Sequence, residues 1–385
     1  MRVLQVISYL NPKIGGDVNV ISNLSKQLVK KGHDVSILTT DFQFDKEFAK
    51  DNQNEGIEII PFHCIINVSS FFYSPAMKAW VKENIKRFDL IHLHNYRSYQ
   101  NNVIHHYAKK YNIPYILQAH GSVLPFFAKQ RLKKLYDFIW GHGILRDASK
   151  VIALTTTEGE QYQTMGVKAN KIEIVPNGID SPKYGNLPEH GMFRKKYGIN
   201  DDEKIILYLG RIHKIKGIDF LIRAFKQLTN TMSNIHLVII GPDDGYYHTM
   251  IESITKNQLK EKITLTGFLD GAEKDAAYYD SDVFVYPSQY DIFGISPFEA
   301  LQFDTPIIVS NRCGCGEFVK AANCGKVIQY NDTNDLIQNI TLLLNNQKMT
   351  SELIENGKKF VADNLTWEKI VSKLEFVYED CIRHV

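Results

Sequence analysis

The chain has 385 residues, of which 44% are hydrophobic and 23% charged, and a formal net charge of +2 at pH 7. This length suits two or three domains of ordinary size, and the near-neutral charge argues against an extended nucleic-acid-binding surface. No hydrophobic run reaches the roughly 18 residues that a membrane span needs. The five cysteines favour a reducing compartment over a disulfide framework, so we expect a cytoplasmic protein.

The first half of the chain alternates short hydrophobic runs with helical patterns. Residues 3–8 (VLQVIS) predict a strand and not a signal peptide, because no cleavage site of small residues follows. A helical pattern then ends at Gly32, a favourable stop signal. Further runs of strand length are VSILTT, IEIIPF, LIHLH, YILQAH, KVIAL and IEIVP. Strands that alternate with helices predict a doubly wound parallel sheet.

The second half repeats this alternation after a segment rich in Pro, Gly and Asn at 176–191. Its strand-like runs are KIILYLG, IHLVIIG, KITLTG, DVFVYP, TPIIVS and GKVIQY, and the pattern from Asp332 onward is nearly all helical. We therefore predict two Rossmann-like domains, residues 1–180 and 181–365, followed by a helix over 366–385. Ligands of such folds bind outside the carboxyl ends of the strands, so we expect the site in a cleft between the domains.

Gly15 and Gly16 lie between the first predicted strand and helix. Bare backbone amides there can approach a phosphate at a helix N-terminus, where the helix dipole favours negative charge. The chain lacks the third glycine of the dinucleotide fingerprint, and a plain tight turn is the alternative interpretation.

Two cations and one histidine follow other predicted strands. Arg211 and Lys216 share the loop after KIILYLG, beside a helix start, and such a pair suits a diphosphate. The alternative is two solvated surface cations. His120 follows YILQ in the first half and would face the same cleft, unless it is a structural histidine bonded to backbone.

Asp291 and Glu299 are carboxylates eight residues apart, where a predicted strand turns into a helix. Carboxylates accept hydrogen bonds from sugar hydroxyls, and the backbone N–H groups of Phe293, Gly294 and Ile295 could bind phosphate or hydroxyl oxygens between them. The alternative is a helix N-terminus, where acidic residues are common.

Several residues resemble metal ligands without the pattern of a metal site. Asp280-Ser281-Asp282 has D-x-D spacing but precedes a strand, and Asp243-Asp244-Gly245 is typical of a loop turn. Cysteines and histidines lack a complete zinc-ligand spacing, and we interpret the histidines as structural or surface residues. These residues are Cys313, Cys315, Cys324, His92, His94, His105 and His106. We therefore predict no metal site.

The stretch 123–140 alternates apolar side chains with Lys and Arg. A basic amphipathic helix of this kind can lie on an anionic membrane surface. The alternative is an ordinary helix that packs its apolar side on the sheet.

Together these motifs resemble the family 4 retaining glycosyltransferases of the GT-B fold. The motifs stand in the family's order over nearly the whole chain. They are the glycine pair, AHGS, VPNGID, GRIHKIKG, VIIG, GF at 267–268, YPSQYDIFGISPFEAL and DTP at 304–306. The resemblance implies two Rossmann-like domains facing a central cleft. Residues 1–180 would hold the acceptor, 181–365 the nucleotide-sugar donor, and the helix 366–385 would return to the first domain.

The resemblance also implies roles for the residues that contact the donor's diphosphate. Gly15 and Gly16 would pack against it, and Arg211 and Lys216 would neutralise the leaving nucleoside diphosphate.

Other roles concern the donor's sugars and base. Glu299 would bond the ribose, Asp291 would contact the donor sugar, and His120 would lie beside the reacting sugar. The base would meet Gly267, Phe268 and Leu269. The family usually has Glu at the position of Asp291, and this shorter side chain bears on which sugar is bound.

The function implied is sugar transfer from a UDP- or GDP-linked donor to a glycan or lipid-linked acceptor, with retention and without a metal cofactor. Assembly of cell-surface polysaccharide or glycoconjugate, at the cytoplasmic membrane face, would suit such an enzyme. Two alternatives remain. A nucleotide-sugar 2-epimerase shares the two-domain fold, and a non-catalytic protein could bind the nucleotide sugar or a glycan.

Overall fold

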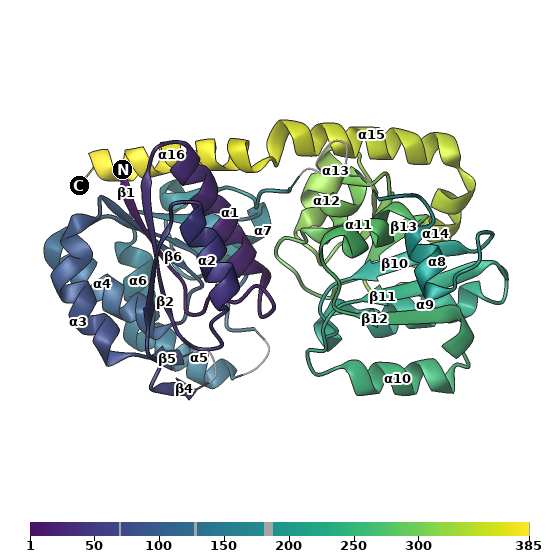
Figure 1. Cartoon of the computed structure of the whole chain (residues 1–385), viewed down its shortest axis with the longest axis horizontal. Coiled ribbons are helices and arrows are strands. Elements are labelled where there is room, and N and C mark those ends of the chain that lie inside the picture. The colour runs from purple at the N-terminus through teal and green to yellow at the C-terminus, as the bar shows by residue number, and fades with distance from the viewer. Residues whose placement is uncertain (69–70, 127–128, 181–187, 385) are drawn as a thin grey trace. The chain divides into compact units, whose positions relative to one another are not determined.

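The computed structural model describes four stretches of the chain (Figure 1), which are residues 1–68, 71–126, 129–180 and 188–384. Two predicted features fall partly outside these stretches. One is the linker of 176–191, with the domain start at 181, and the other is Phe127 in the amphipathic stretch.

The chain divides into two compact units. Unit 1 comprises Met1–Gly178 and Trp367–Val385, and unit 2 comprises Ile179–Thr366. The first unit is therefore discontinuous in sequence. Where its two segments meet, the Trp367 ring occupies the space in which a Cβ at Gly178 would lie, so glycine is the residue that fits there.

Unit 1 is built on a seven-stranded sheet in the order β3-β2-β1-β6-β7-β8-β9, with every neighbouring pair parallel. Its strands are β1 (Arg2–Val6), β2 (Asp34–Thr40), β3 (Glu58–Phe62), β6 (Leu90–His94), β7 (Tyr115–Gln118), β8 (Lys150–Ala153) and β9 (Ile172–Ile174). A small antiparallel hairpin, β4 (Ile66–Val68) and β5 (Phe71–Tyr73), was not predicted.

Helices cover both faces of this sheet (Figure 1). On one face, α16 packs against α1 and β6. On the opposite face, buried residues of α3, α4 and α6 form a hydrophobic core with those of the strands. The helices are α1 (Gly16–Lys30), α2 (Lys46–Asn54), α3 (Pro75–Asn84), α4 (Tyr99–Tyr111), α5 (Gln130–Tyr136), the π-helical turn η2 (Asp137–Gly141), α6 (His142–Asp147), α7 (Thr156–Thr164) and α16 (Trp367–Arg383). Short 3-10 turns lie at Ile85–Arg87 and Ala169–Lys171.

Unit 2 contains a six-stranded parallel sheet in the order β12-β11-β10-β13-β14-β15. Its strands are β10 (Lys204–Leu209), β11 (Ile235–Ile240), β12 (Ile263–Gly267), β13 (Val283–Tyr286), β14 (Ile307–Ser310) and β15 (Lys326–Ile328). β11 is buried along its whole length, as a strand covered on both faces requires, and its apolar sequence IHLVII reflects that burial.

The helices of unit 2 are α8 (Met192–Tyr197), α9 (Ile218–Leu228), α10 (Tyr247–Lys256), α11 (Gly271–Tyr279), α12 (Ser296–Gln302), α13 (Cys315–Ala321), α14 (Thr333–Asn345) and α15 (Gln347–Asn364). Short 3-10 turns lie at Lys214–Lys216 (η4) and Lys260–Lys262. The predicted fold class, two Rossmann-like domains with doubly wound parallel sheets, is confirmed.

The amphipathic stretch 123–140 differs from the alternative interpretation, in which its apolar side would pack on the sheet. The helix begins only at Gln130, and its large apolar side chains lie in solvent instead of packing on the sheet. Leu132 is 64% exposed and Phe138 82% exposed, and Leu135 and Ile139 are exposed as well. Among the residues that the structure describes, no helix combines the length and apolar character needed to cross a bilayer.

Candidate functional site

The predicted site residues of unit 2 gather at the carboxyl edge of its sheet, because parallel strands all end at that edge. The loops carry Arg211 and Lys216 after β10, Phe268 and Leu269 after β12, and Asp291, Phe293, Gly294 and Ile295 after β13, whereas Gly267 is the last residue of β12. Glu299 lies in the first turn of the following helix, α12.

Lys216 and Asp291 form a buried ion pair. The Lys216 Nζ donates to Asp291 Oδ2 and, at 3.0 Å, to the Tyr286 hydroxyl, which donates to the same carboxylate oxygen at 2.5 Å. Only 10% of the Lys216 side chain and 18% of the Asp291 side chain are exposed. Burial acts to raise the pKa of Asp291, but the Lys216 charge and the two hydrogen bonds outweigh it and hold this pKa below its usual value.

The backbone around Lys216 explains how this pair forms. Gly217 has a φ of +70°, and a Cβ there would overlap the carbonyl oxygen of Pro287. Glycine therefore lets the loop after β10 lie directly against the end of β13. This close approach brings Lys216 to Asp291, whose own carbonyl accepts from Gly314 at 2.8 Å.

Arg211 has a different environment from Lys216. Its side chain is 52% exposed and donates to Asp244 at 2.6 Å. The two predicted cations thus share a loop, but one is buried and the other lies at the surface. An exposed pair of this kind is a weak contact, so a ligand anion can compete for Arg211 at low energetic cost.

Only part of the backbone between Asp291 and Glu299 has N–H groups available to a ligand. The Phe293 N–H donates to Asp291 Oδ1 at 3.3 Å. Gly294 has no room for a side chain, because a Cβ there would press on the Tyr286 ring at 2.8 Å. Ile295 begins the turn into α12 and accepts from Glu299 N at 3.1 Å.

Glu299 is held apart from Asp291 by its own partners. Lys274 donates to Glu299 Oε1 at 3.0 Å, and the Tyr278 hydroxyl donates to Oε2 at 2.9 Å. Burial acts to lower the pKa of Lys274, but the Glu299 charge and hydrogen bond outweigh it, so this pKa is raised. The two acids of the motif therefore occupy two distinct sites, each with its own lysine and tyrosine.

The predicted base-binding loop lies at the end of β12. Gly267 has a φ of +76° and accepts from Gly241 N at 2.9 Å. Phe268 is half exposed. An exposed aromatic ring on a fixed turn can stack on a planar ligand.

The glycine pair of unit 1 precedes α1. A Cβ at Gly15 would overlap the Asp17 carboxylate, whereas Gly16 faces open space. Asp17 accepts from Asn95 Nδ2 at 2.7 Å and from its neighbour Val18 N at 3.1 Å. A carboxylate therefore already lies at the N-terminus of α1, where it weakens the attraction of that terminus for an anion.

His120 lies after β7, half-buried, in a left-handed backbone conformation with φ +51°. Its Nε2 is 2.9 Å from His94 Nδ1, and the following Gly121 N–H donates to Glu158 at 2.6 Å. Burial lowers the pKa of His120 to about 4, although the Asp17 charge acts to raise it. His120 is therefore a neutral imidazole at pH 7. Unit 1 thus brings His120 and the glycine pair to the carboxyl edge of its own sheet.

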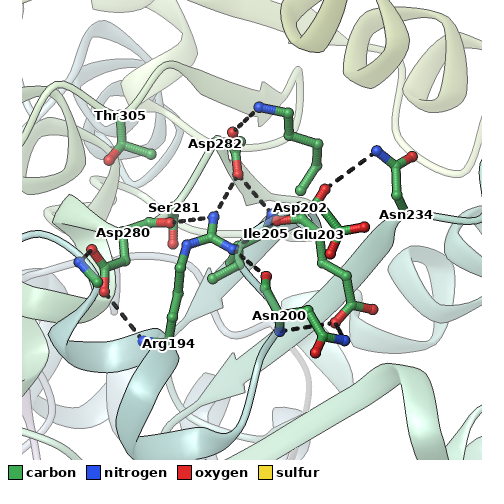
Figure 2. Close-up of polar contacts among 12 residues, drawn as sticks. Arg194, Asn200, Asp202, Glu203, Ile205, Asn234, Asp280, Ser281, Asp282 and Thr305 are labelled. Atoms are coloured by element: carbon green, nitrogen blue, oxygen red, sulfur yellow. Dashed lines mark hydrogen bonds and ion pairs between the residues drawn. The ribbon is translucent and has the colours of Figure 1, made fainter.

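The D-x-D segment is a structural turn between α11 and β13, as predicted (Figure 2). Asp280 accepts from the backbone N–H groups of Gly191, Phe193 and Arg194 at the start of α8. Asp282 accepts from Ile205 N at 2.8 Å and from the Arg194 guanidinium at 3.0 Å. Both carboxylates are thereby engaged in joining α8 to the amino edge of the sheet.

The other residues that resemble metal ligands also make structural contacts. Asp243 accepts from the N–H groups of Gly245, Tyr246 and Tyr247, so it forms the turn before α10. Cys313 and Cys315 are free thiols with their sulfur atoms 3.1 Å apart. Within the described stretches, no three His, Cys, Asp or Glu side chains converge as a metal site would require.

Sequence reasoning missed several partners of these residues. They are Tyr286, Lys274, Tyr278, Asp17, Asn95 and His94. The sequence did hold a signal for His94, which is the last residue of β6 and pairs with Gln118 on the neighbouring strand β7. Gln118 is two residues before His120, so the two histidines lie at adjacent strand ends. Asp17 directly follows the glycine pair. The Lys216–Tyr286 contact could not be read from the chain, since its partners are 70 residues apart. Lys274 and Tyr278 lie four residues apart on one face of α11, but their shared contact with Glu299 on α12 could not be read from that spacing.

Two family models match the chain. "Glycosyltransferase Family 4" matches residues 14–182, and "Glycosyl transferases group 1" matches residues 191–360. The N-acetyl-alpha-D-glucosaminyl L-malate synthase of Bacillus anthracis is 25% identical over 382 residues, with 97% of this chain and 96% of the relative covered. The alpha-monoglucosyldiacylglycerol synthase of Streptococcus pneumoniae is 25% identical over 328 residues, with 77% and 68% covered.

A solved structure of similar fold is that of Anabaena HepE in complex with UDP and glucose. It matches with a TM-score of 0.80 at 17% identity, covering 99% of this chain and 100% of that chain. This likeness concerns the fold alone. The two family models lie one on each Rossmann-like half, in the order that the motifs predict. The chain therefore belongs to the family 4, group 1 glycosyltransferases and has their GT-B fold.

Proposed function

We propose that this glycosyltransferase moves a sugar from a nucleoside-diphosphate sugar to a hydroxyl group of a glycan or lipid-linked acceptor, with retention of the anomeric configuration. The buried Lys216–Asp291 pair carries this proposal. It holds a cation with low solvent exposure at the edge where ligands of doubly wound folds bind.

Lys216 would stabilise the charge that develops on the departing diphosphate. Its ammonium has three N–H donors, and Asp291 and Tyr286 accept from it, which leaves one donor for a phosphate oxygen. Arg211 would leave Asp244 to make a second contact. Fixed donors of this kind stabilise a developing charge because they need no rearrangement during the reaction.

Asp291 would have two roles. Its Oδ2 keeps Lys216 in place, and its Oδ1, which accepts from Phe293 N at 3.3 Å, would accept a hydroxyl of the donor sugar. The side chain is one carbon shorter than the family's usual Glu, and it still reaches Lys216. Glu299, with both oxygens already bonded, would accept the ribose hydroxyls through its remaining lone pairs.

The transfer itself breaks the bond between the anomeric carbon and the diphosphate oxygen and forms a bond to the acceptor oxygen on the same face. The acceptor's proton would pass to the departing phosphate oxygen. His120 would hold a sugar hydroxyl beside the reacting carbon. As a neutral imidazole it would not serve as the acid. Gly16, with open space before it, would admit the donor, and the two cations would make a metal ion unnecessary.

The donor would carry UDP or GDP. UDP has support from Anabaena HepE, whose structure was solved with UDP and glucose. The base would lie on Phe268, between Gly267 and Leu269. Polysaccharide or glycolipid assembly is supported by the Streptococcus pneumoniae relative, an alpha-monoglucosyldiacylglycerol synthase.

A membrane-bound acceptor would suit the surface of α5 and η2. Leu132 and Phe138 project there beside the cations Arg131, Lys133 and Lys134. Flotation with anionic vesicles should recover the wild-type protein but lose most of it after L132S/F138S. F376S, which removes an equally exposed ring on α16, is the matched control. Equal flotation of all three proteins would refute the membrane contact.

Thermal unfolding with UDP, GDP, ADP and CDP, each with EDTA or Mg²⁺, tests the donor site. A nucleotide at 100 times its Kd should add about 2.7 kcal/mol of stability. We expect one nucleotide to stand out in EDTA, and R211A to weaken its effect. No shift with any nucleotide would refute the site, and a shift only with Mg²⁺ would refute metal independence.

The epimerase alternative is tested by the fate of the donor. Conversion of the donor sugar into an isomer, without any acceptor, would indicate the epimerase.

A further inference from the structure

A chain of buried polar side chains runs beneath His120 in unit 1. His94 Nε2 lies 2.7 Å from Gln5 Oε1, and His94 Nδ1 lies 2.9 Å from His120 Nε2. Gln5 Nε2 donates to the Tyr378 hydroxyl at 3.5 Å, and that hydroxyl lies 2.7 Å from His92 Nδ1. Gln5, His92, His94 and Tyr378 are all almost fully buried.

With the Gln5 side-chain oxygen toward His94, the order of donors and acceptors fixes the proton on His94 and on His120. The Gln5 oxygen can only accept, so His94 must donate from Nε2. Because burial holds the pKa of His94 well below its usual value, its ring carries a single proton, and Nδ1 is then an acceptor. His120 must therefore donate from Nε2 to His94.

The relative orientation of the two rings agrees with a strong hydrogen bond. The centroids of His94 and His120 are 5.2 Å apart and their planes differ by only 16°. With nitrogens 2.9 Å apart, the rings lie edge to edge and nearly coplanar. The N–H bond then points along the lone pair of its acceptor, as a hydrogen bond prefers.

We infer that His94 is a positioning residue that holds His120 in the Nε2–H tautomer, so that His120 offers an unprotonated Nδ1 to its ligand. A nitrogen of this kind accepts a hydrogen bond and cannot donate one. The group it binds must therefore be a proton donor, and for a sugar substrate this is a hydroxyl. The identity of the ligand rests on the proposed function, but the tautomer does not.

The backbone of His120 is held from the other side as well. Glu158 on α7 accepts from Gly121 N at 2.6 Å and from Leu154 N at 2.8 Å. His120 itself is in the left-handed region, which costs free energy for a residue with a side chain. Contacts on both sides of this residue thus maintain a conformation that His120 would not adopt alone.

Nitrogen-15 NMR of histidine-labelled protein at pH 7 tests the tautomer without any substrate. The signals of His120 are assigned by their loss in H120Q. We expect a protonated Nε2 and an unprotonated Nδ1 in the wild-type protein. A protonated Nδ1 would overturn the inference.

Two variants at position 94 separate positioning from packing. H94F keeps a ring but removes the acceptor, whereas H94N keeps an acceptor near the position of Nδ1. We expect H94F to give a mixture of His120 tautomers and to lower kcat by at least about tenfold, as loss of a group that orients a functional histidine does. H94N should retain the Nε2–H tautomer and most of kcat.

The outcomes distinguish this inference from the proposed function. If H94F keeps the wild-type tautomer and turnover, His94 does not position His120. If the wild-type protein shows the expected tautomer, but transfers no sugar from any nucleoside diphosphate, the positioning stands and the proposed function fails. The NMR result on the wild-type protein remains decisive even if H94F does not fold.

Discussion

Lys216 and Asp291 are 75 residues apart in the chain, yet their side chains form one buried ion pair at the carboxyl edge of the unit 2 sheet. The pair joins the loop after β10 to the loop after β13. Each charge is largely shielded from water, so each needs the opposite charge of its partner to offset the cost of desolvation.

The first prediction concerns removal of one or both charges of this pair. K216M alone leaves a buried carboxylate without a counter-charge and should lower the free energy of unfolding by about 3–5 kcal/mol. K216M/D291N removes both charges and should recover most of that loss, but consume no donor. Urea denaturation and donor turnover measure the two effects. Wild-type turnover by the double variant would rule out Lys216 as the diphosphate-binding cation.

The second prediction uses the exposed cation. The Arg211–Asp244 contact should contribute at most about 1 kcal/mol, as exposed pairs do, so R211A should unfold at nearly the wild-type temperature. Loss of one charged contact to the developing diphosphate should nevertheless lower kcat by roughly 100-fold. K214A, in the same loop and also exposed, is the matched control. Equal turnover of R211A and K214A would contradict the assignment.

The third prediction concerns the stability of unit 1 in acid. Burial lowers the pKa of His92 to about 3 and of His120 to about 4, and also lowers that of His94. Because these folded pKa values lie below the unfolded value of 6.5, the stabilisation is complete above pH 6.5 and is lost as pH falls. At pH 5.5, one unit below the unfolded pKa, each histidine lowers the free energy of unfolding by roughly 1.4 kcal/mol relative to neutral pH.

Glu158 acts in the opposite direction. Burial raises its pKa to about 7, above its usual 4.5, so its contribution is present at low pH and is lost as pH rises towards 7. Three histidines outweigh this one carboxyl below pH 6.5. Hydrogen exchange of the β6 and β7 amides should therefore accelerate between pH 6.5 and 5, after correction for intrinsic rates. H94N, with one histidine fewer, should reduce the slope, and an unchanged slope would exclude His94 from the effect.

The fourth prediction separates structure from metal binding at the D-x-D turn. D280A removes the acceptor of three backbone N–H groups at the start of α8, and should destabilise unit 2 by about 1–2 kcal/mol, as loss of a helix cap does. Turnover per folded molecule should stay at the wild-type level, with EDTA or with Mg²⁺. A variant that folds normally but has lost a metal-dependent activity would favour the metal site.

Much of the fold follows from local sequence. Runs such as IHLVII, separated by helical patterns and glycines, predicted both parallel sheets, because a strand covered on both faces must be apolar throughout. The β4–β5 hairpin was missed, since its strands have three residues each and leave no period to detect. The alternative interpretation of 123–140, an apolar side packed on the sheet, was wrong for α5, because periodicity shows that a helix has an apolar face but not what covers it.

The candidate site was only partly predictable. Strand ends located Lys216, Asp291 and His120, because the fold fixes where loops meet. Their partners depend on contacts between segments far apart in sequence, such as Tyr286 with Lys216, and no local pattern encodes them. His94 was interpreted as a structural or surface histidine, and burial agrees with a structural role, but its contact with His120 could not be read from spacing.

The discontinuity of unit 1 bears on how the protein is synthesised. Tyr378, which bonds to Gln5 and His92, lies on α16, and the ribosome must make all of unit 2 before this helix exists. The sheet of unit 1 emerges first, together with α1, but the parts of α1 and β6 that α16 covers stay exposed until then. Unit 2 is continuous and can complete its core earlier. The half that begins the chain would therefore finish folding last, and its exposed face is where a chaperone would bind the nascent protein.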